Sequence, residues 1–126
     1  MVIGGGAAGF FCAVNVARLQ PDWQVTILEK GSKVLQKVKV SGGGRCNVTH
    51  DCSSISEMSK CYPRGEKFVK KLFRHFFVPN SIQWFAERGV ALKVEKDGRM
   101  FPVTNDSQTI IECLLKEANQ FGVELL

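Results

Sequence analysis

The spacing of glycines near the start of the chain is suited to binding a nucleotide. Gly4, Gly6 and Gly9 match the pattern G-x-G-x-x-G in the stretch "VIGGGAAGFF". In this pattern the first glycine permits a tight turn after a strand, the second lets the backbone approach a pyrophosphate, and the third lets the next helix pack closely on the sheet. A helix that begins at Ala7 would aim its unpaired N–H groups and the positive end of its dipole at the phosphates.

A carboxylate follows the motif at the spacing expected for a ribose contact. Glu29 ends an apolar, β-branched run and lies 20 positions after Gly9. A carboxylate at this place accepts hydrogen bonds from a ribose diol. It would also repel a 2′-phosphate, which argues against NADP, although the neighbouring Lys30 softens that objection. NAD, FAD and S-adenosylmethionine sites all begin in this way, so the first motif leaves the three cofactors open.

A second glycine-rich loop, "KVSGGGRCN", occupies residues 39–47. Gly42 to Gly44 carry no side chains, so their backbone could lie flat against a planar or phosphorylated group. Arg45 offers a cationic fork for a phosphate or a polarised carbonyl, and Asn47 offers donors and acceptors for a polar ring edge. A ligand that reaches beyond the first motif needs such a second surface. FAD is long in this sense, because its flavin lies far from its adenosine.

The glycine motif lies within a strand–helix–strand sequence, which is the βαβ unit. Residues 1–3 are expected to end a strand, residues 7–19 to form a helix, and residues 25–29 to form a fully buried parallel strand. Residues 30–47 are expected to be mostly loop, with a short helical turn around residues 34–38.

The remaining chain predicts further helices and a hairpin. The stretch "THDCSSISEMS", residues 49–59, is polar and turn-prone, and we expect no regular structure there. The expected elements are an amphipathic helix over 65–77, a helix over 81–88 capped by Asn80 and ended by Gly89, a hairpin turning at Asp97–Gly98, a helix over 107–120 capped by Asp106 or Ser107, and a parallel strand from Val123.

Composition excludes few classes of protein. The 126 residues suffice for one domain, and the net charge of +5 suits anionic ligands. No apolar run is long enough to span a membrane, and no secretory signal is visible, so we expect a cytoplasmic protein without a membrane partner. The five cysteines form no C-x-x-C pair, which speaks against a disulfide-reductase cycle. They are expected to be reduced thiols, with no metal site.

Five segments in this order carry a resemblance to a known family: "VIGGGAAG", "ILEKG", "KVSGGGRCNVTH", "YPRG" and "GRMFPVTNDSQTI". The chain resembles bacterial NAD(P)/FAD-dependent oxidoreductases, a family that includes aminoacetone-oxidase-like and bile-acid-reductase-like flavoproteins. The resemblance implies an α/β fold: a Rossmann-like FAD-binding βαβ unit with a long insertion, roughly residues 48–106, that contains helices and a β-hairpin. Members are longer, so residues 1–126 would be the N-terminal part of a FAD/NAD(P)-binding domain, an incomplete domain.

The resemblance also implies roles for individual residues. The first loop would face the FAD pyrophosphate, Glu29 would hold the adenosine ribose with Lys30 beside it, and the second loop would run along the pyrophosphate-to-flavin part. The residues expected to bind the cofactor are Gly4, Gly6, Ala7, Ala8, Gly9, Glu29, Lys30, Gly43, Gly44, Arg45, Cys46 and Asn47. Cys46 is either a thiol that contacts the flavin or, the better interpretation, a small buried filler.

The expected function is that of the FAD-binding portion of a flavin-dependent oxidoreductase acting on a small organic substrate. The flavin would perform two-electron transfer, with a nicotinamide, NAD(P)H, or oxygen as the other redox partner. We assign no catalytic residue, and His50, near the second loop, is only a weak acid–base candidate. The fragment alone is expected to be inactive.

Other functions remain alternatives at this point. The cationic residues of the expected helix over 65–77 could form a nucleic-acid surface, but charged faces of amphipathic helices are usually just solvated. A flavin-dependent RNA-modifying enzyme would keep the cofactor and change the substrate. A methyltransferase would share the first loop, but Arg45 has no obvious task there.

Overall fold

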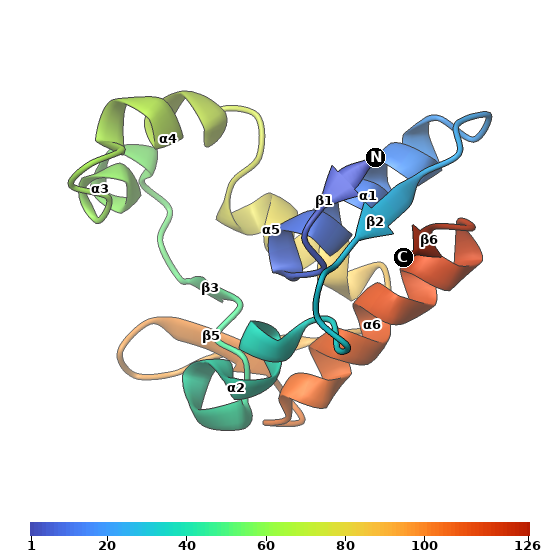
Figure 1. The fold of residues 1–126 in the computed structure, drawn as a ribbon. Helices are drawn as coiled ribbons and strands as arrows, with labels where there is room; N and C mark the ends of the chain where they lie inside the picture. Colours follow the sequence, from blue (N-terminus) through green and yellow to red (C-terminus); the bar gives the residue numbers. More distant parts are fainter. The chain divides into compact units, whose positions relative to one another are not determined.

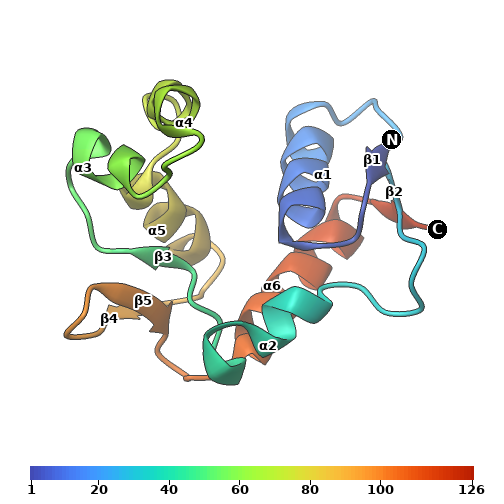
Figure 2. The ribbon, with the colours of Figure 1, turned by 60° about the vertical axis from the view of Figure 1, so that its left-hand side comes forward.

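The computed structural model describes all 126 residues, and they divide into two compact units. Unit 1 comprises Met1–Cys46 and Thr104–Leu126, and unit 2 comprises the intervening segment Asn47–Val103. Figures 1 and 2 show the elements of both units. Each unit has its own three-stranded sheet, so each is described by itself.

The sheet of unit 1 is parallel. Its strands are β1 (Val2–Ile3), β2 (Thr26–Leu28) and β6 (Glu124–Leu125), in the order β1-β2-β6. Ile27 pairs with Val2 on one side and with Leu125 on the other, so β2 is the central strand. The predicted α/β fold with a parallel βαβ unit is confirmed.

Two helices form the core of unit 1 with this sheet. Helix α1 (Ala7–Leu19) packs on β1 and β2, and α6 (Ser107–Gln120) packs against α1, as Figure 2 shows. Both helices have the predicted bounds, because a glycine turn starts α1 and the Asp106 carboxylate caps α6 by accepting from Gln108 N at 2.8 Å. The fully buried side chains of unit 1 include Phe10, Val14, Ile27 and Leu35.

The central strand β2 is less buried than its apolar sequence predicts. Val25 and Ile27 are buried, but Thr26 and Leu28 are only half-buried, and Ile3 on β1 is exposed. Successive side chains of a strand point to opposite faces of the sheet. The pattern therefore follows from α1 covering one face, and the prediction of a fully buried strand was wrong.

Helix α2 (Gln36–Gly44) replaces much of the predicted loop. Its regular part ends at Val40, because Ser41 has extended backbone and Gly42 and Gly43 have left-handed backbone. The helix packs against α6, and the Ser107 hydroxyl donates to Lys39 O at 2.9 Å. The sequence predicted only one turn here, because α2 depends on a partner helix that is distant along the chain.

The sheet of unit 2 is antiparallel. It consists of β3 (Thr49–His50), β5 (Arg99–Pro102) and β4 (Leu92–Val94), in the order β3-β5-β4. The predicted hairpin is confirmed, with Asp97–Gly98 at its turn and Gly98 in the left-handed region at φ +82°. Strand β3 lies in the segment expected to lack regular structure, because two residues paired to a distant strand leave no local signal.

Three helices complete unit 2: α3 (Ile55–Lys60), α4 (Glu66–Leu72) and α5 (Val78–Ala86). Helix α3 also lies in the segment predicted to be irregular, and Ser54 caps it by accepting from Glu57 N. The predicted helix over 65–77 ends at Leu72. A separate helix, α5, begins at Val78, and Pro79 lies in its first turn, where the N–H that proline lacks has no intrahelical partner.

The start of α5 also differs from the prediction. Phe77, with extended backbone, is the N-cap residue, and Asn80 lies three positions later rather than at the cap. Its Oδ1 accepts from Phe77 N at 2.8 Å, which satisfies a donor just outside the helix. Gly89, at φ +76°, follows the end of the helix as predicted.

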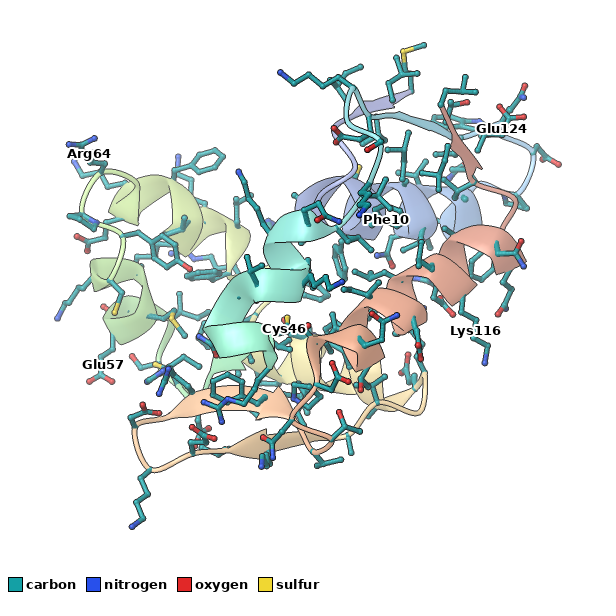
Figure 3. The ribbon with its side chains drawn as sticks, turned by 60° about the horizontal axis from the view of Figure 1, so that its bottom comes forward. Phe10, Cys46, Glu57, Arg64, Lys116 and Glu124 are labelled. Atoms are coloured by element: carbon teal, nitrogen blue, oxygen red, sulfur yellow. The ribbon has the colours of Figure 1, made fainter.

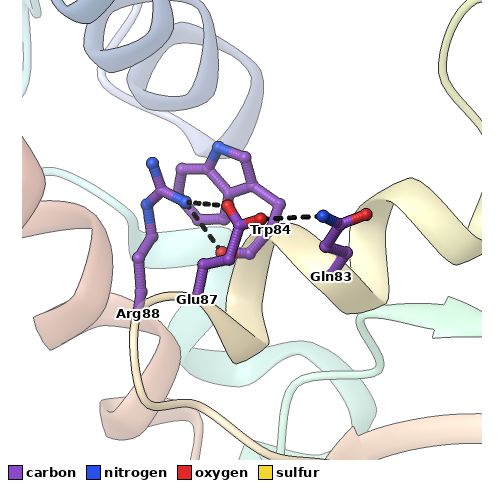
Figure 4. Close-up of polar contacts among 4 residues, drawn as sticks. All are labelled: Gln83, Trp84, Glu87 and Arg88. Atoms are coloured by element: carbon purple, nitrogen blue, oxygen red, sulfur yellow. Dashed lines mark hydrogen bonds and ion pairs between the residues drawn. The ribbon is translucent and has the colours of Figure 1, made fainter.

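The other end of α5 is held by a side-chain cluster, which Figure 4 shows. The Arg88 guanidinium lies 3.8 Å from the centre of the Trp84 ring and donates to Trp84 O at 2.8 Å. Glu87 accepts from Gln83 Nε2 at 2.8 Å and lies 3.8 Å from Arg88. A cation at a helix C-terminus satisfies a late carbonyl and favours the helix dipole, so this cluster stabilises α5.

The hydrogen bond of Asn80 to Phe77 predicts a measurable contribution to stability. Replacement of Asn80 by alanine removes the acceptor of Phe77 N and should lower the free energy of unfolding by about 1 kcal/mol. Chemical unfolding followed by circular dichroism checks this value. Asn80→Asp keeps an acceptor at the same place and should restore most of the loss, whereas equal losses in both variants would contradict the assignment.

Candidate dinucleotide-binding site

The first glycine loop forms a tight turn between β1 and α1. Gly4 lies at φ +100°, and its N–H donates to Leu28 O at 2.7 Å, which joins the turn to β2. A Cβ on Gly9 would lie 1.9 Å from Gly4 O, so a side chain there would collide with the backbone of the turn. Gly4 and Gly9 therefore shape the loop in the manner predicted for the first and third glycines of the motif.

Gly6 leaves the N-terminus of α1 open. It is the N-cap residue, it supplies no side-chain cap, and the first turn of α1 contains no acidic residue. A Cβ on Gly6 would find no atom within 4 Å, and Ala7 and Ala8 beside it are exposed. The unpaired N–H groups and the positive end of the helix dipole thus face space that an anionic group can enter.

The Glu29 carboxylate holds the first loop from the end of β2. Its Oε2 accepts from Gly5 N and its Oε1 accepts from Gly31 N, both at 2.8 Å. These two bonds, led by that from Gly31, lower the pKa of Glu29 below its ordinary value of 4.5. An ionised carboxylate has about four lone-pair sites, so acceptor capacity remains for a ribose diol. Lys30 is exposed next to it.

Gly5 and Leu35 are site residues that the sequence motif did not reveal. Besides donating to Glu29, Gly5 accepts from Leu35 N at 2.8 Å, and a Cβ on Gly5 would lie 2.7 Å from Val34 Cγ1. Leu35 itself is buried and lies at φ +56° just before α2. The close approach to Val34 requires a glycine at position 5. In the sequence, the only indication of this requirement is that Gly5 is a glycine at a position where the G-x-G-x-x-G pattern allows any residue.

Helix α2 connects the first glycine loop to the second. It starts beside Gly5 and runs below the N-terminal end of α1 in Figure 2. The regular part from Gln36 to Val40 advances by about 6 Å at the usual rise of an α-helix. The glycines of both loops belong to unit 1, with one short helix between them.

The three glycines of the second loop have a conformational cause. Gly42, Gly43 and Gly44 lie at φ +57°, +69° and +84°, a left-handed run that residues with side chains rarely adopt. Cys46 N then donates to Ser41 O at 3.0 Å and closes the loop. A Cβ on Gly43 would find no atom within 4 Å, so its backbone is also approachable.

The last residues of the second loop divide between the units. Arg45, half-buried, is the C-cap residue of α2, and Cys46 is buried beside α2 and α6, as Figure 3 shows. Burial raises the pKa of the Cys46 thiol, with a smaller opposing effect from the Ser41 hydroxyl. Burial and a protonated thiol favour the interpretation of Cys46 as a filler.

Asn47 belongs to unit 2 and has a structural task there. Its amide nitrogen donates to Thr49 O at 2.9 Å and to Met100 O at 3.2 Å, so it joins β3 to β5. His50, the weak acid–base candidate, is exposed, and its ring lies 2.6 Å from the position that a Cβ on Gly98 would take. Both side chains thus contribute to the sheet of unit 2.

The described residues offer neither a metal cluster nor a membrane-spanning helix. The described residues contain no group of three or more histidine, cysteine or acidic side chains placed to hold a metal ion. None of the helices combines the length and the apolar character needed to cross a bilayer.

Comparisons with known proteins identify relatives of the whole chain. The family model described as "HI0933-like protein Rossmann domain" matches residues 1–126. The chain is 31% identical over 98% of its length to the 3-dehydro-bile acid delta(4,6)-reductase of Clostridium scindens, and it covers 29% of that protein. It is also 31% identical over its full length to the ribosomal RNA dihydrouridine synthase of Haemophilus influenzae, of which it covers 30%.

A solved structure supports the fold. The crystal structure of Thermovibrio ammonificans THI4 matches 98% of the chain with a TM-score of 0.60 and 14% identity, and the chain covers 36% of it. The chain spans about 30% of the length of the curated relatives that it matches. The resemblance inferred from the sequence is confirmed, including the bile-acid-reductase-like relatives.

The second and third glycines of the motif predict unequal effects on stability. Gly9→Ala places a methyl group against Gly4 O and should lower the free energy of unfolding by about 3 kcal/mol. Gly6→Ala is the matched control, because its Cβ meets no atom and its φ of −91° suits alanine, so it should cost no more than about 1 kcal/mol. Urea unfolding measures both, and similar losses would contradict the described turn.

The lowered pKa of Glu29 predicts a dependence of stability on pH. The folded chain keeps this carboxylate ionised where the unfolded chain protonates it, so its contribution is complete above pH 4.5 and is lost as the pH falls through the folded-state pKa. Glu29→Gln should flatten this acid dependence, measured as urea midpoints between about pH 6 and pH 3. Glu112→Gln on the exposed side of α6 controls for the charge, and an unchanged acid slope in Glu29→Gln would disprove the role of this carboxylate.

Proposed function

The chain belongs to the HI0933-like Rossmann-domain family, and from this premise we propose that unit 1 binds FAD as the cofactor portion of a flavin-dependent oxidoreductase. The observation that carries the proposal is the uncapped N-terminus of α1 behind a glycine turn, with Glu29 at the end of the neighbouring strand. A dinucleotide presents a pyrophosphate and a ribose in that order, which suits these two features.

The open space beside Gly6 shows whether the N-terminus of α1 has room for a pyrophosphate. The space that a Cβ would fill lies directly before the free N–H groups of α1, where a pyrophosphate oxygen could approach the backbone. Glu29 would then accept from the adenosine ribose, with its orientation already fixed by Gly5 and Gly31. The residues present therefore suit a dinucleotide.

The second loop extends the proposed site toward the flavin. Gly43, Gly44 and Arg45 would lie along the part of FAD between pyrophosphate and flavin, because α2 leads from the first loop to them. This extension favours FAD over NAD or S-adenosylmethionine, which are shorter. Cys46 would support the loop from inside, and Asn47 would hold the adjoining strand of unit 2.

The bound flavin would supply two-electron redox chemistry, and this chain would bind and orient it. The N–H groups of α1 would neutralise the pyrophosphate, and Glu29 would fix the ribose. Unit 1 contributes no side chain that we propose as an acid or base. The complete protein would supply the substrate-side groups, with NAD(P)H or oxygen as the other redox partner.

The names of the relatives suggest two classes of substrate for the complete protein. The Clostridium scindens relative is named as a reductase of a bile acid, a small organic molecule, and this class agrees with the expectation from the sequence. The Haemophilus influenzae and Escherichia coli relatives are named as ribosomal RNA dihydrouridine synthases, at 31% and 28% identity. A flavin-dependent RNA-modifying enzyme is therefore the second candidate, and the six lysines and arginines between residues 60 and 77 of unit 2 favour it.

Substitution of Gly6 should remove the cofactor without unfolding the protein. Gly6→Ala places a methyl group where the pyrophosphate would approach, so the flavin retained on purification should fall at least about tenfold, a loss of about 1.4 kcal/mol in binding. The measurement is the flavin absorbance per mole of full-length protein, with the released cofactor identified by chromatography.

The control for this experiment lies outside the site. Gly65→Ala adds a methyl group before α4, where its nearest neighbour is 4.0 Å away, and should leave the flavin content unchanged. Purified wild-type protein that carries no flavin and takes up none when FAD is added would refute the proposal.

A further inference from the structure

The excess positive charge of the chain is concentrated in one short segment of unit 2. Six of the 17 lysines and arginines lie between residues 60 and 77, where Glu66 is the single acid. The rest of the chain carries eleven cations and eleven anions, so this segment accounts for the whole net charge of +5. Such a concentration attracts polyanions to this segment in particular.

The same segment exposes apolar side chains that its sequence pattern would assign to a core. Helix α4 contains no buried residue, and the exposed fractions of Phe68, Leu72 and Phe76 are 67%, 49% and 38%. Phe68 and Leu72 are four positions apart, so they lie on one face of the helix. The exposed Lys67 and Lys71 precede them directly and flank this face.

The inner side of α4 holds this face in place. Val69, Lys70 and Phe73 are half-buried, and the Phe73 ring lies 5.2 Å from that of Phe77. Phe73 also makes an edge contact with Tyr62 at 5.9 Å, and Lys70 Nζ donates to Ser56 Oγ of α3 at 3.4 Å. Because α4 has contacts on its inner side, the outward residues are presented as a defined surface.

We propose that this surface, the α4 surface formed by Arg64, Lys67, Phe68, Lys71, Leu72 and Phe76, binds single-stranded RNA. Cations would contact the phosphates, and the exposed Phe68 ring would stack on a base, which is the combination that single-strand binding sites use. Figure 3 shows Arg64 in the turn before α4, pointing away from Glu57 of α3. The Glu57 carboxylate therefore does not lie among the cations of the α4 surface.

The observations favour RNA over a membrane as the partner. Helix α4 has only 7 residues, about 10 Å in length, and its exposed face alternates cations with apolar groups within single turns. An interfacial helix instead buries a long continuous apolar stripe. The choice of RNA over DNA rests on the second candidate function, whereas the flavin proposal concerns unit 1 and is tested separately by flavin content.

The experiment measures binding of a fluorescein-labelled single-stranded RNA of about 16 nucleotides to the full-length protein by anisotropy. Wild-type affinity should fall with salt, with a slope near −2 in log K against log [salt] if three cations contact phosphates. Lys67→Ala/Lys71→Ala should make the slope shallower by about 1.4, and Phe68→Ala should weaken binding about tenfold at an unchanged slope.

Matched variants outside the surface make the result specific. Lys96→Ala/Lys116→Ala removes the same charge from exposed positions elsewhere, and Val94→Ala shortens an exposed apolar side chain on β4. Both should leave RNA affinity and slope unchanged, and all variants should retain the flavin content and circular dichroism of the wild type.

Three results would overturn the proposal. One is the absence of salt-dependent RNA binding by the wild type. Another is an equal effect of the two double-lysine variants, which would show a nonspecific charge effect. The third is preference for a different partner, shown either by tighter binding of DNA of the same sequence or by Phe68-dependent binding to phosphatidylglycerol vesicles with RNA affinity insensitive to Phe68.

Discussion

The arrangement of unit 1 depends on the carboxylate of Glu29, which accepts from the backbone on two sides. Through Gly5 it fixes the turn between β1 and α1, and through Gly31 it fixes the chain that leaves β2. The carbonyl oxygen of the same Gly5 accepts from Leu35 N and so sets the start of α2. One ionised side chain thus orients the first glycine loop, the N-terminus of α1 and the helix that leads to the second loop. The sequence predicts Glu29 only as a ligand contact, but its carboxylate also holds the backbone of unit 1 in place.

The parts of the fold that local chemistry determines could be predicted from the sequence. Helices α1 and α6 have the predicted bounds, because glycines and an aspartate cap mark their ends. The hairpin follows from the Asp97–Gly98 turn. Helix α2 and strand β3 were missed, because each depends on a partner far along the chain: α6 for α2, and β5 for β3. Helix α3 was missed for another reason, since Ser54 and Glu57 are a weak capping signal within a polar stretch.

The candidate site shows a similar division between what spacing reveals and what it hides. The tasks of Gly4 and Gly9 are geometric: Gly4 has a positive φ, and a Cβ on Gly9 would collide with Gly4 O. The contribution of Gly5 could not be predicted, because it depends on Val34 approaching from a segment expected to be loop. The glycines of the second loop are required first by a left-handed chain path, so their number alone does not indicate contact with a ligand. Asn47 is a polar residue that the sequence assigns to the ligand, but its amide nitrogen donates to carbonyl oxygens of β3 and β5.

The α4 segment shows why an amphipathic pattern predicts a helix better than it predicts burial. The apolar spacing in residues 65–77 correctly indicates helical structure, but α4 ends at Leu72, a new helix begins at Val78, and the shortened α4 has only one covered side. Val69 and Phe73 occupy that side, so Phe68 and Leu72 are left in solvent between lysines. Phe68 and Leu72 lie side by side on one face of the helix. Neighbouring exposed apolar side chains lower solubility more than the same side chains scattered singly over a surface. The lysines around them offset this effect by keeping the surface hydrated. They also restrict the partner, because a neutral or cationic surface would leave the lysines unpaired. A polyanion with planar bases pairs with the lysines and covers the apolar side chains at once.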